Sequence, residues 1–413
     1  MHTLIENVTL FFSRDFQVVR KGWIEIDHGA ITYAGEDKPH FSSQDTRVLN
    51  GDGLLAIPGL IDAHTHIGDS IAKDMGVGLG LNQLVHPIHG LKTRLLNEAQ
   101  EGQVRHAMNE ITCDMLASGI TTFVDFREGG LNGVVLALKS IYDPRQRAMI
   151  LGRPNYNFQE DEVAKESQGL PSTVLDELER ALDICSGVGL SGPNEYTGEA
   201  MKQISEIAKS KRKLVAVHAA ESLESKRFSL EHFSAAEVDR ALRYMKPDFM
   251  VHLANSTAEE RQKVSERQIP VVCSPRANAI LGLGLPPILD LLERGVTVAL
   301  GTDNVMLNAP DMFREMDYTS RAIRAFKREP GAISCNDILK MATISAADAL
   351  GLGSMIGSIE EGKRADIAFL DLNSPNLHFS RDLVASTVHR ARACDVRCVM
   401  VEGDILHGSI PRA

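Results

Sequence analysis

Residues Leu54 to His66 read LLAIPGLIDAHTH, an almost continuous apolar run that ends in two histidines one residue apart. Such a run is typical of a strand that is buried on both faces, as in a parallel sheet covered by helices. Side chains two residues apart on a strand point the same way. His64 and His66 are therefore predicted to project together from the end of a buried strand.

Seven further apolar runs follow along the chain. They are TTFVDF (121–126), RAMILGRP (147–154), GVGLSG (187–192), KLVAVHAAE (213–221), DFMVHLA (248–254), IPVVCSP (269–275) and VTVALGTD (296–303). Eight strand and helix units between Pro58 and about Leu352 predict an α/β fold, a (β/α)8 TIM barrel. A doubly wound sheet is the structural alternative, but no glycine-rich phosphate fingerprint follows its first strand.

The segments between these runs carry helix signals. Residues 103–119 repeat apolar side chains with the helical period and stop at Gly119. Ser256 and Glu259 form a capping-box pattern at the predicted start of a later helix. These signals support the alternation of strands and helices that a barrel requires.

The two ends of the chain have a different pattern of apolar and polar residues. Short alternating runs, punctuated by glycine, asparagine and aspartate, fill residues 1–57 and return over residues 358–413. Each piece is too small to hold a core alone. We therefore expect them to pair into one small composite β-sandwich domain beside a barrel that spans residues 58–357.

Composition excludes several classes of function. The 413 residues include 44 Lys and Arg against 55 Asp and Glu, a formal net charge of 44 − 55 = −11. An acidic chain without a basic run is a poor binder of nucleic acid or anionic membranes. Six scattered cysteines without a CxxC pair predict free thiols in a reducing cytoplasm. We see no signal peptide and no membrane-spanning run, and expect a cytoplasmic protein.

Polar residues stand where four of the predicted strands end. They are His64, His66, His218, Glu221, His252 and Asp303. A TIM barrel places its chemistry at the carboxyl ends of its strands, so these side chains are predicted to converge. Imidazoles that are buried together are costly unless they are paired, and a divalent metal removes that cost. His64, His66, His218 and Asp303 form a mixed nitrogen and oxygen set that suits zinc or iron, with one position open for water.

Each of these motifs is weak alone. A single pair of histidines is more often incidental than metal-binding, and a lone His252 after an apolar run is more often a satisfied core residue. Convergence at one barrel mouth is what favours a metal site. Arg153, at the end of the third strand, is a candidate substrate-binding residue, and Asp125 to Glu128 either bind substrate or pair with one another.

His86 and His89 lie in the long segment from Gly68 to Gln103 that follows the first strand. A segment of this length at a barrel mouth is a plausible lid or pocket wall. His89 is a second candidate for substrate binding. For both histidines, an ordinary loop position is at least as good an interpretation.

The motifs PGLIDAHTHIG, VHAAE, VHLA, SPRAN, LGTDN and GSIEEGKRADIAFLDL resemble those of the amidohydrolase superfamily. The resemblance runs nearly end to end. Dinuclear members carry a carbamylated lysine at the end of strand four, whereas GVGLSGPNEYTGE here has none. The resemblance is therefore to the mononuclear aminohydrolase branch, which includes S-adenosylhomocysteine, guanine and cytosine deaminases and triazine chlorohydrolases.

This resemblance implies a role for each residue. His64, His66, His218 and Asp303 would bind one divalent metal, with zinc preferred and iron as the alternative. Asp303 would take a proton from the activated water, and Glu221 would protonate a ring nitrogen. His252 would stabilise the oxyanion that forms when water adds to the carbon bearing the amino group.

The resemblance implies a hydrolase of carbon–nitrogen bonds that deaminates a small aminated heterocycle, such as a purine, pyrimidine, pterin or nucleoside derivative. Members that bind adenosine-type substrates carry a Trp and an acidic residue after strand one, and LGLNQLVHPIHGLKTRLL has neither. Dechlorination or opening of a cyclic amide is the enzymatic alternative, and a non-catalytic scaffold is the other. Homo-oligomers are common among such enzymes, and the sequence specifies no interface.

Overall fold

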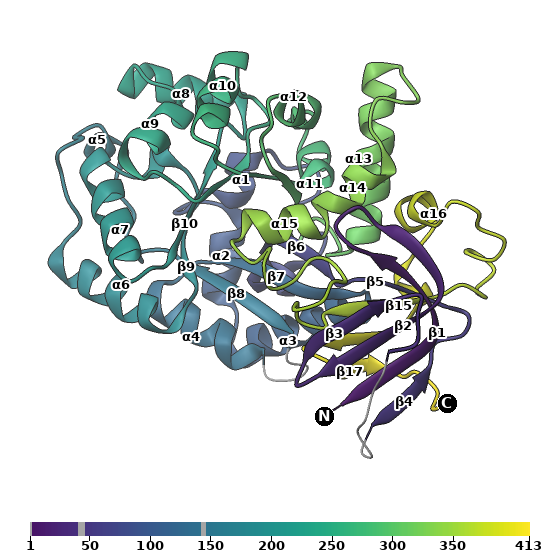
Figure 1. Cartoon of the computed structure of the whole chain (residues 1–413). Helices are drawn as coiled ribbons and strands as arrows, with labels where there is room; N and C mark the ends of the chain where they lie inside the picture. The colour runs from purple at the N-terminus through teal and green to yellow at the C-terminus, as the bar shows by residue number, and fades with distance from the viewer. Residues whose placement is uncertain (1, 40–45, 142–145) are drawn as a thin grey trace.

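The computed structural model describes residues 2–39, 46–141 and 146–413. One of its sheets is parallel and carries the predicted runs. Its strands are β6 (Leu60–His66), β7 (Ile120–Arg127), β8 (Arg147–Gly152), β9 (Gly187–Leu190), β10 (Leu214–Ala219), β11 (Phe249–His252), β12 (Val271–Cys273), β13 (Val298–Leu300) and β14 (Asp303–Asn304). Their order is β13-β12-β11-β10-β9-β8-β7-β6-β14. Only two residues separate β13 from β14 in the chain, yet the two strands lie at opposite ends of this order. The sheet therefore curls round on itself, as in a barrel of the TIM type (Figure 1).

Helices alternate with these strands and lie around them (Figure 1). They are η1 (Ile67–Ala72), α1 (Leu81–Val85), α2 (Leu91–Glu98), α3 (Glu101–Ala117), α4 (Gly130–Ser140), α5 (Glu160–Val163), α6 (Ser172–Ile184), η2 (Pro193–Glu195), α7 (Gly198–Ser210), α8 (Leu223–Phe233), α9 (Glu237–Tyr244), α10 (Ala258–Glu266), α11 (Pro275–Ile280), α12 (Ile288–Glu293), α13 (Met312–Lys327), α14 (Cys335–Met341) and α15 (Ile344–Ala349). Two further helices, α16 (Leu383–His389) and η3 (Ala393–Asp395), lie between strands of the other sheet. Across the described ranges, none of them has the length and apolar character that crossing a bilayer requires.

Strand periodicity sorts the core into layers. On β7, Phe123 packs into the large cluster that includes the surrounding helices. Val124 and Phe126 instead join a second cluster with α15 and with residues from the other barrel strands. Since successive residues of a strand face opposite sides, the barrel strands are buried on both faces, as their continuous apolar sequences predict.

The other sheet combines both ends of the chain. Its strands are β1 (Thr3–Phe12), β2 (Gln17–Asp27), β3 (Ala30–Gly35), β4 (Arg47–Asn50), β5 (Leu54–Pro58), β15 (Ile367–Asp371), β16 (Val396–Val401) and β17 (Asp404–Gly408). Within the described ranges they form one sheet, β17-β16-β15-β5-β1-β2-β3, with β4 beside β1. Ile24, Phe369 and Met400, from both halves, share one buried cluster. The predicted sandwich is thus one continuous hydrogen-bonded sheet around its own core, and the boundaries at 57/58 and 357/358 stay a prediction.

The run LLAIPGLIDAHTH is two strands and not one, which corrects the sequence analysis. β5 pairs with β1 and β15 of the chain-end sheet, whereas β6 pairs with β7 and β14 of the barrel. Gly59 lies between them, where a Cβ atom would meet Thr121 Oγ1 at 2.2 Å. Only glycine, which has no Cβ atom, allows Thr121 to approach the backbone this closely. The chain passes from the chain-end sheet to the barrel at this residue.

The predicted cap of α10 is wrong by one residue. The N-cap is Thr257, whose side chain accepts a hydrogen bond from the backbone of Glu260, and Glu260 completes the capping box. Ser256 instead donates its hydroxyl to the carbonyl oxygen of Leu253 at 2.7 Å. Ser256 with Glu259 and Thr257 with Glu260 both have the spacing of a capping box, so the spacing alone does not show which pair caps the helix.

Candidate metal centre and active site

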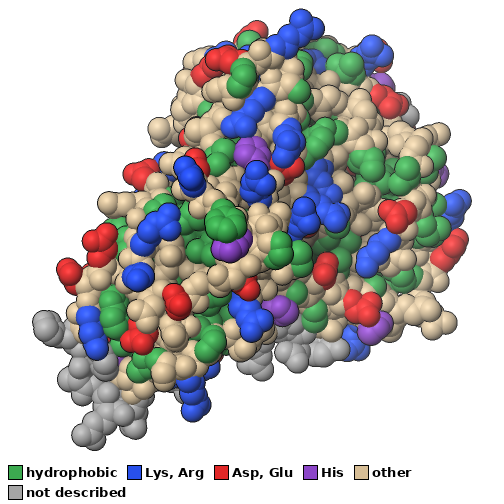
Figure 2. All heavy atoms as spheres, turned by 90° about the vertical axis from the view of Figure 1, so that its right-hand side faces the viewer, with side chains coloured by type: hydrophobic (Ala, Val, Ile, Leu, Met, Phe, Trp, Pro, Cys, Tyr) green, Lys and Arg blue, Asp and Glu red, His purple; other side chains and the backbone are tan. Residues whose placement is uncertain are grey.

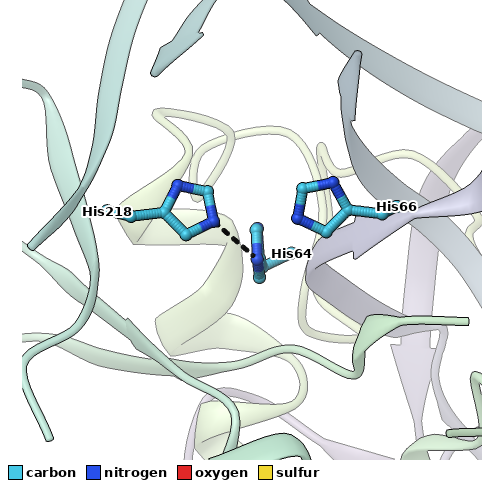
Figure 3. Close-up of side chains that lie close together, drawn as sticks. All are labelled: His64, His66 and His218. Carbon is cyan, nitrogen blue, oxygen red and sulfur yellow. Dashed lines mark hydrogen bonds between the residues drawn. The ribbon is translucent and has the colours of Figure 1, made fainter. Parts of the chain in front are cut away.

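Five buried side chains converge at the ends of the barrel strands. They are His64, His66, His218, His252 and Asp303. In Figure 3 the rings of His64, His66 and His218 turn toward one another. The Nε2 atoms of His64 and His218 are 3.2 Å apart. Oδ1 of Asp303 lies 3.2 Å from Nε2 of His64 and 3.5 Å from Nε2 of His66. The structure therefore brings together the side chains that the sequence analysis groups as metal ligands.

The backbone at two of these strand ends is unusual. His252, the last residue of β11, has a φ of 75°, and Asp303, the first of β14, has a φ of 65°. Residues other than glycine rarely adopt this left-handed region. Such conformations persist where the surrounding structure holds them in place, and they gather at functional sites.

Asp62, which the sequence analysis missed, holds the first and last barrel strands together. Its carboxylate accepts the backbone N–H of Thr302 at 2.9 Å and the Thr302 hydroxyl at 2.5 Å. It also accepts the backbone N–H of His64 at 3.5 Å. Burial raises the pKa of Asp62 to about 7. Asp62 thus places His64 relative to the segment that leads into Asp303.

Carbonyl oxygens orient two of the histidine rings. Nδ1 of His218 lies 2.8 Å from the carbonyl oxygen of Leu190, and Nδ1 of His66 lies 3.2 Å from that of Phe126. A carbonyl only accepts, so each Nδ1 carries the proton and each Nε2 presents a lone pair to the cluster. Carbonyl partners of this kind commonly fix metal-binding histidines.

The cluster fits a divalent metal. Burial lowers the pKa of His64 to about 3 and that of His218 well below its ordinary value, so both rings are neutral at pH 7. Oδ2 of Asp303 is buried without a hydrogen-bond partner among the described residues. Facing lone pairs and an unpartnered carboxylate oxygen are costly unless a cation lies between them. Nitrogen and oxygen donors of this kind suit zinc or iron.

Glu221 lies beside this cluster, on the loop after β10. Its Oε1 is 3.6 Å from Nε2 of His252. Burial raises the pKa of Glu221 above its ordinary value. A carboxyl group with a raised pKa can give and take a proton near neutrality. Asn278 approaches the other side of His252, with its Nδ2 3.4 Å from Nδ1.

The loop that carries Glu221 is held by Glu237 and Asn255, which the sequence analysis also missed. Glu237 accepts the backbone N–H of Ala220 at 3.0 Å and the Ser225 hydroxyl at 2.5 Å. Asn255 donates its side-chain amide to the Glu221 carbonyl oxygen at 2.7 Å. Burial raises the pKa of Glu237 to about 7. Glu237 begins α9, and its position in an ordinary helical sequence gives no sign of this contact.

We expect Glu237→Ala to lower kcat by about 10- to 100-fold, because a small displacement of Glu221 misaligns proton transfer. Metal content should stay unchanged. Glu237→Gln, which still accepts one hydrogen bond, should recover part of the loss, and Glu231→Ala on the exposed end of α8 is the control. Equal kcat values for Glu237→Ala and the unmodified protein would contradict this role.

A chain of ion pairs flanks His66. Lys92 of α2 is buried, with its Nζ 2.6 Å from Glu128 Oε1 and 3.5 Å from Asp69 Oδ2. Arg127 pairs with Glu128 and with Asp125. Of the two interpretations of the segment Asp125 to Glu128, these contacts favour mutual pairing. Lys92 and Asp69 escaped the sequence analysis because they lie in the long segment after strand one, where no periodic pattern marks them.

That segment, Gly68 to Gln103, comprises most of η1, then α1, α2 and the start of α3. His86 and His89 stack at 5.3 Å between ring centroids. Nδ1 of His86 accepts the backbone N–H groups of Ile88 and His89, both at 3.2 Å, so His86 stabilises a turn. His89 is exposed on the surface of the segment. Its substrate-binding role stays a prediction.

Arg153 follows β8, where the sequence analysis places a candidate substrate-binding residue. It donates to the Ser191 hydroxyl and, at 3.3 Å, to Oε2 of Glu195. Both partners follow β9, so the contact joins the ends of neighbouring strands. Arg153 is partly buried, with 16% of its side chain exposed, and its substrate-binding role stays a prediction.

A separate crevice of about 710 Å³ lies between α13 and α16. Its lining includes Arg314, Arg321, Arg390 and Arg392. Figure 2 looks onto this side of the molecule and shows Lys and Arg side chains gathered across its middle. The five clustered side chains do not line this crevice, which is therefore distinct from the candidate metal centre.

Comparison with known proteins agrees with this geometry. The sequence model described as "Amidohydrolase family" matches residues 55–406. An uncharacterized protein of Methanocaldococcus jannaschii is 36% identical over 393 residues, which are 93% of this chain and 94% of the relative. A 5-methylthioadenosine/S-adenosylhomocysteine deaminase of Thermoanaerobacter pseudethanolicus is 27% identical, over 98% of this chain and 94% of the relative. A solved adenosine deaminase from Xanthomonas campestris with bound zinc has the same fold, with a TM-score of 0.83, 21% identity and coverage of 98% and 92%.

Proposed function

The chain belongs to the amidohydrolase family, and from this premise we propose that it is a metal-dependent hydrolytic deaminase of a small aminated nitrogen heterocycle. The substrate would be a purine, pyrimidine, pterin or nucleoside derivative, and the product ammonia. The observation that carries the proposal is the placement of Glu221 and His252 beside three imidazoles and a buried carboxylate. The similarity to a named deaminase over nearly the whole chain supports it.

The metal would be held by His64, His66, His218 and Asp303. Zinc is the preferred ion because the donors are mainly imidazole nitrogens, and iron is the alternative. When bound, the ion supplies Lewis acidity and lowers the pKa of water toward neutrality. The solved relative with bound zinc supports this choice.

The side chains would divide the proton transfers among them. Asp303, through its unpartnered Oδ2, takes a proton from the attacking water. Glu221 protonates a ring nitrogen, which makes the adjacent carbon more electrophilic. The water oxygen then bonds to that carbon, and His252 stabilises the oxyanion through Nε2, which has no hydrogen-bond partner among the described residues. Return of a proton to the amino group breaks the carbon–nitrogen bond and releases ammonia.

Arg153 and His89 are proposed to contact the part of the substrate away from the reacting carbon. Arg153 is the better supported of the two, because it lies at a strand end of the barrel.

An ammonia-release assay over purines, pyrimidines, pterins and their nucleosides tests this function. We expect ammonia from at least one of them, at a rate that depends on added zinc or iron. Release of chloride from a chlorotriazine, or of a new carboxylate from a cyclic amide, without ammonia from any amino compound would contradict the proposal.

A further inference from the structure

Arg153, Ser191 and Glu195 form a closed polar group at the mouth of the barrel. Arg153 donates to Ser191 and Glu195, and the Ser191 hydroxyl donates to Oε2 of Glu195 at 2.8 Å. The side chains of Arg153 and Glu195 are 16% and 27% exposed, and both residues follow the carboxyl ends of barrel strands, where the clustered histidines also lie. The carboxylate of Glu195 therefore already neutralises the positive charge of Arg153 before any ligand binds.

Glu195 lies in the segment that follows β9, and the end of β9 contacts the candidate active site. The carbonyl oxygen of Leu190 lies 2.8 Å from Nδ1 of His218. Asn194, the residue before Glu195, donates its side-chain amide to Oε1 of Glu237 at 3.2 Å, and Glu237 holds the loop that carries Glu221. The negative charge of Glu195 adds a smaller contribution to the burial that raises the pKa of Glu221. The ion pair of Arg153 and Glu195 thus lies at the ends of β8 and β9, beside β10, which ends near His218 and Glu221. A substrate whose ring nitrogen contacts Glu221 would extend toward this pair.

The other buried cations beside the cluster are also paired. Lys92 contacts Glu128 and Asp69, and Arg127 contacts Glu128 and Asp125. Together with Arg153 and Glu195, these pairs hold three cations and four carboxylates, a formal charge of 3 − 4 = −1. The charges of Glu221 and Asp303 are not included in this sum. An anionic ligand group would find each of these three cations already bound to a carboxylate.

We infer, on the basis of the proposed function, that the site accepts aminated heterocycles without an anionic substituent and that Glu195 enforces this selection by holding Arg153. An incoming phosphate or carboxylate must displace Glu195 from Arg153. It would then leave the partly buried carboxylate of Glu195 without its charge partner, and separating a partly buried charge pair in this way is unfavourable. A neutral substituent does not compete with Glu195 for Arg153 and meets no such cost.

The first test compares kcat/KM for molecules that differ only in an anionic group. Adenosine and adenosine 5′-monophosphate form one pair, and pterin and pterin-6-carboxylate form another. For each heterocycle that releases ammonia, we expect the neutral member to be preferred by at least about tenfold. An anionic member that is used as well as or better than its neutral partner overturns the inference and leaves the proposed function intact. Absence of ammonia from every compound overturns both.

The second test assigns the selection to Glu195. Glu195→Gln frees the charge of Arg153, and the preference for the neutral member should fall by at least about tenfold, mainly through a lower KM for the anionic member. Ser191→Ala is the matched control, because it removes a hydroxyl with the same two partners but keeps both charges, and its preference should stay near that of the unmodified protein. An unchanged preference in Glu195→Gln, or an equal change in Ser191→Ala, contradicts the role of Glu195. Some variants could lower the melting temperature and so reduce the amount of folded protein. The ratio of kcat/KM for the neutral member to kcat/KM for the anionic member is not altered by such a loss, so this ratio is the quantity compared.

Discussion

Glu221→Gln is expected to lower kcat by at least about 10³-fold while the protein keeps its metal. Glutamine has the shape of glutamate but cannot carry the proton, and general acid–base catalysis contributes about 10²- to 10⁴-fold. The raised pKa of Glu221 and its position 3.6 Å from His252 are the observations behind this expectation. Ammonia release and elemental analysis of the same preparation measure the two quantities.

Glu224→Gln is the matched control for this variant. Glu224 is exposed and lies three residues further along the chain, in the first turn of α8. Its replacement by glutamine removes the same charge as the Glu221 variant does. It should retain nearly full activity. Near-normal kcat in Glu221→Gln would show that another group moves the proton.

His66→Ala is expected to lose most of the bound metal and, with it, all measurable ammonia release. His66 directs Nε2 toward Oδ1 of Asp303, and its ring is oriented by the carbonyl oxygen of Phe126. Removing one nitrogen donor from a site of four ligands leaves too few to hold the ion firmly. The melting temperature should also fall relative to the metal-loaded protein, because bound metal stabilises the folded state.

His106→Ala is the control for this second variant. His106 lies on α3, pairs with Glu110 and has 71% of its side chain exposed. Its replacement should leave metal content and activity unchanged. A His66→Ala protein with the metal content of the unmodified protein would remove His66 from the ligand set.

Much of this site could be predicted from the sequence because a parallel barrel obeys a simple rule. Its strands are buried on both faces, so they read as apolar runs, and the polar residues that end them gather at one mouth. His64, His218 and Asp303 are far apart in sequence, yet each ends or closely follows such a run. The rule needs no knowledge of side-chain packing, and it groups His64 with Asp303, 239 positions further along the chain, which the structure places in contact.

Features that depend on contacts between distant side chains were not predictable in this way. Glu237 and Lys92 lie on helices whose sequences look ordinary, and their roles come from partners that the fold brings close. The division of the run from Leu54 to His66 depends on the approach of Thr121 to Gly59, a contact across 62 residues. An apolar run shows that a segment is buried, but it does not show which of two sheets buries it.

The metal dependence of ammonia release tests the central claim most directly. The purified protein should contain about one zinc or iron ion per chain. It should lose ammonia release when a chelator removes the ion and recover it when zinc or iron is returned. Undiminished ammonia release from metal-free protein would contradict the account, as would a protein that neither binds these metals nor releases ammonia from any heterocycle when they are supplied.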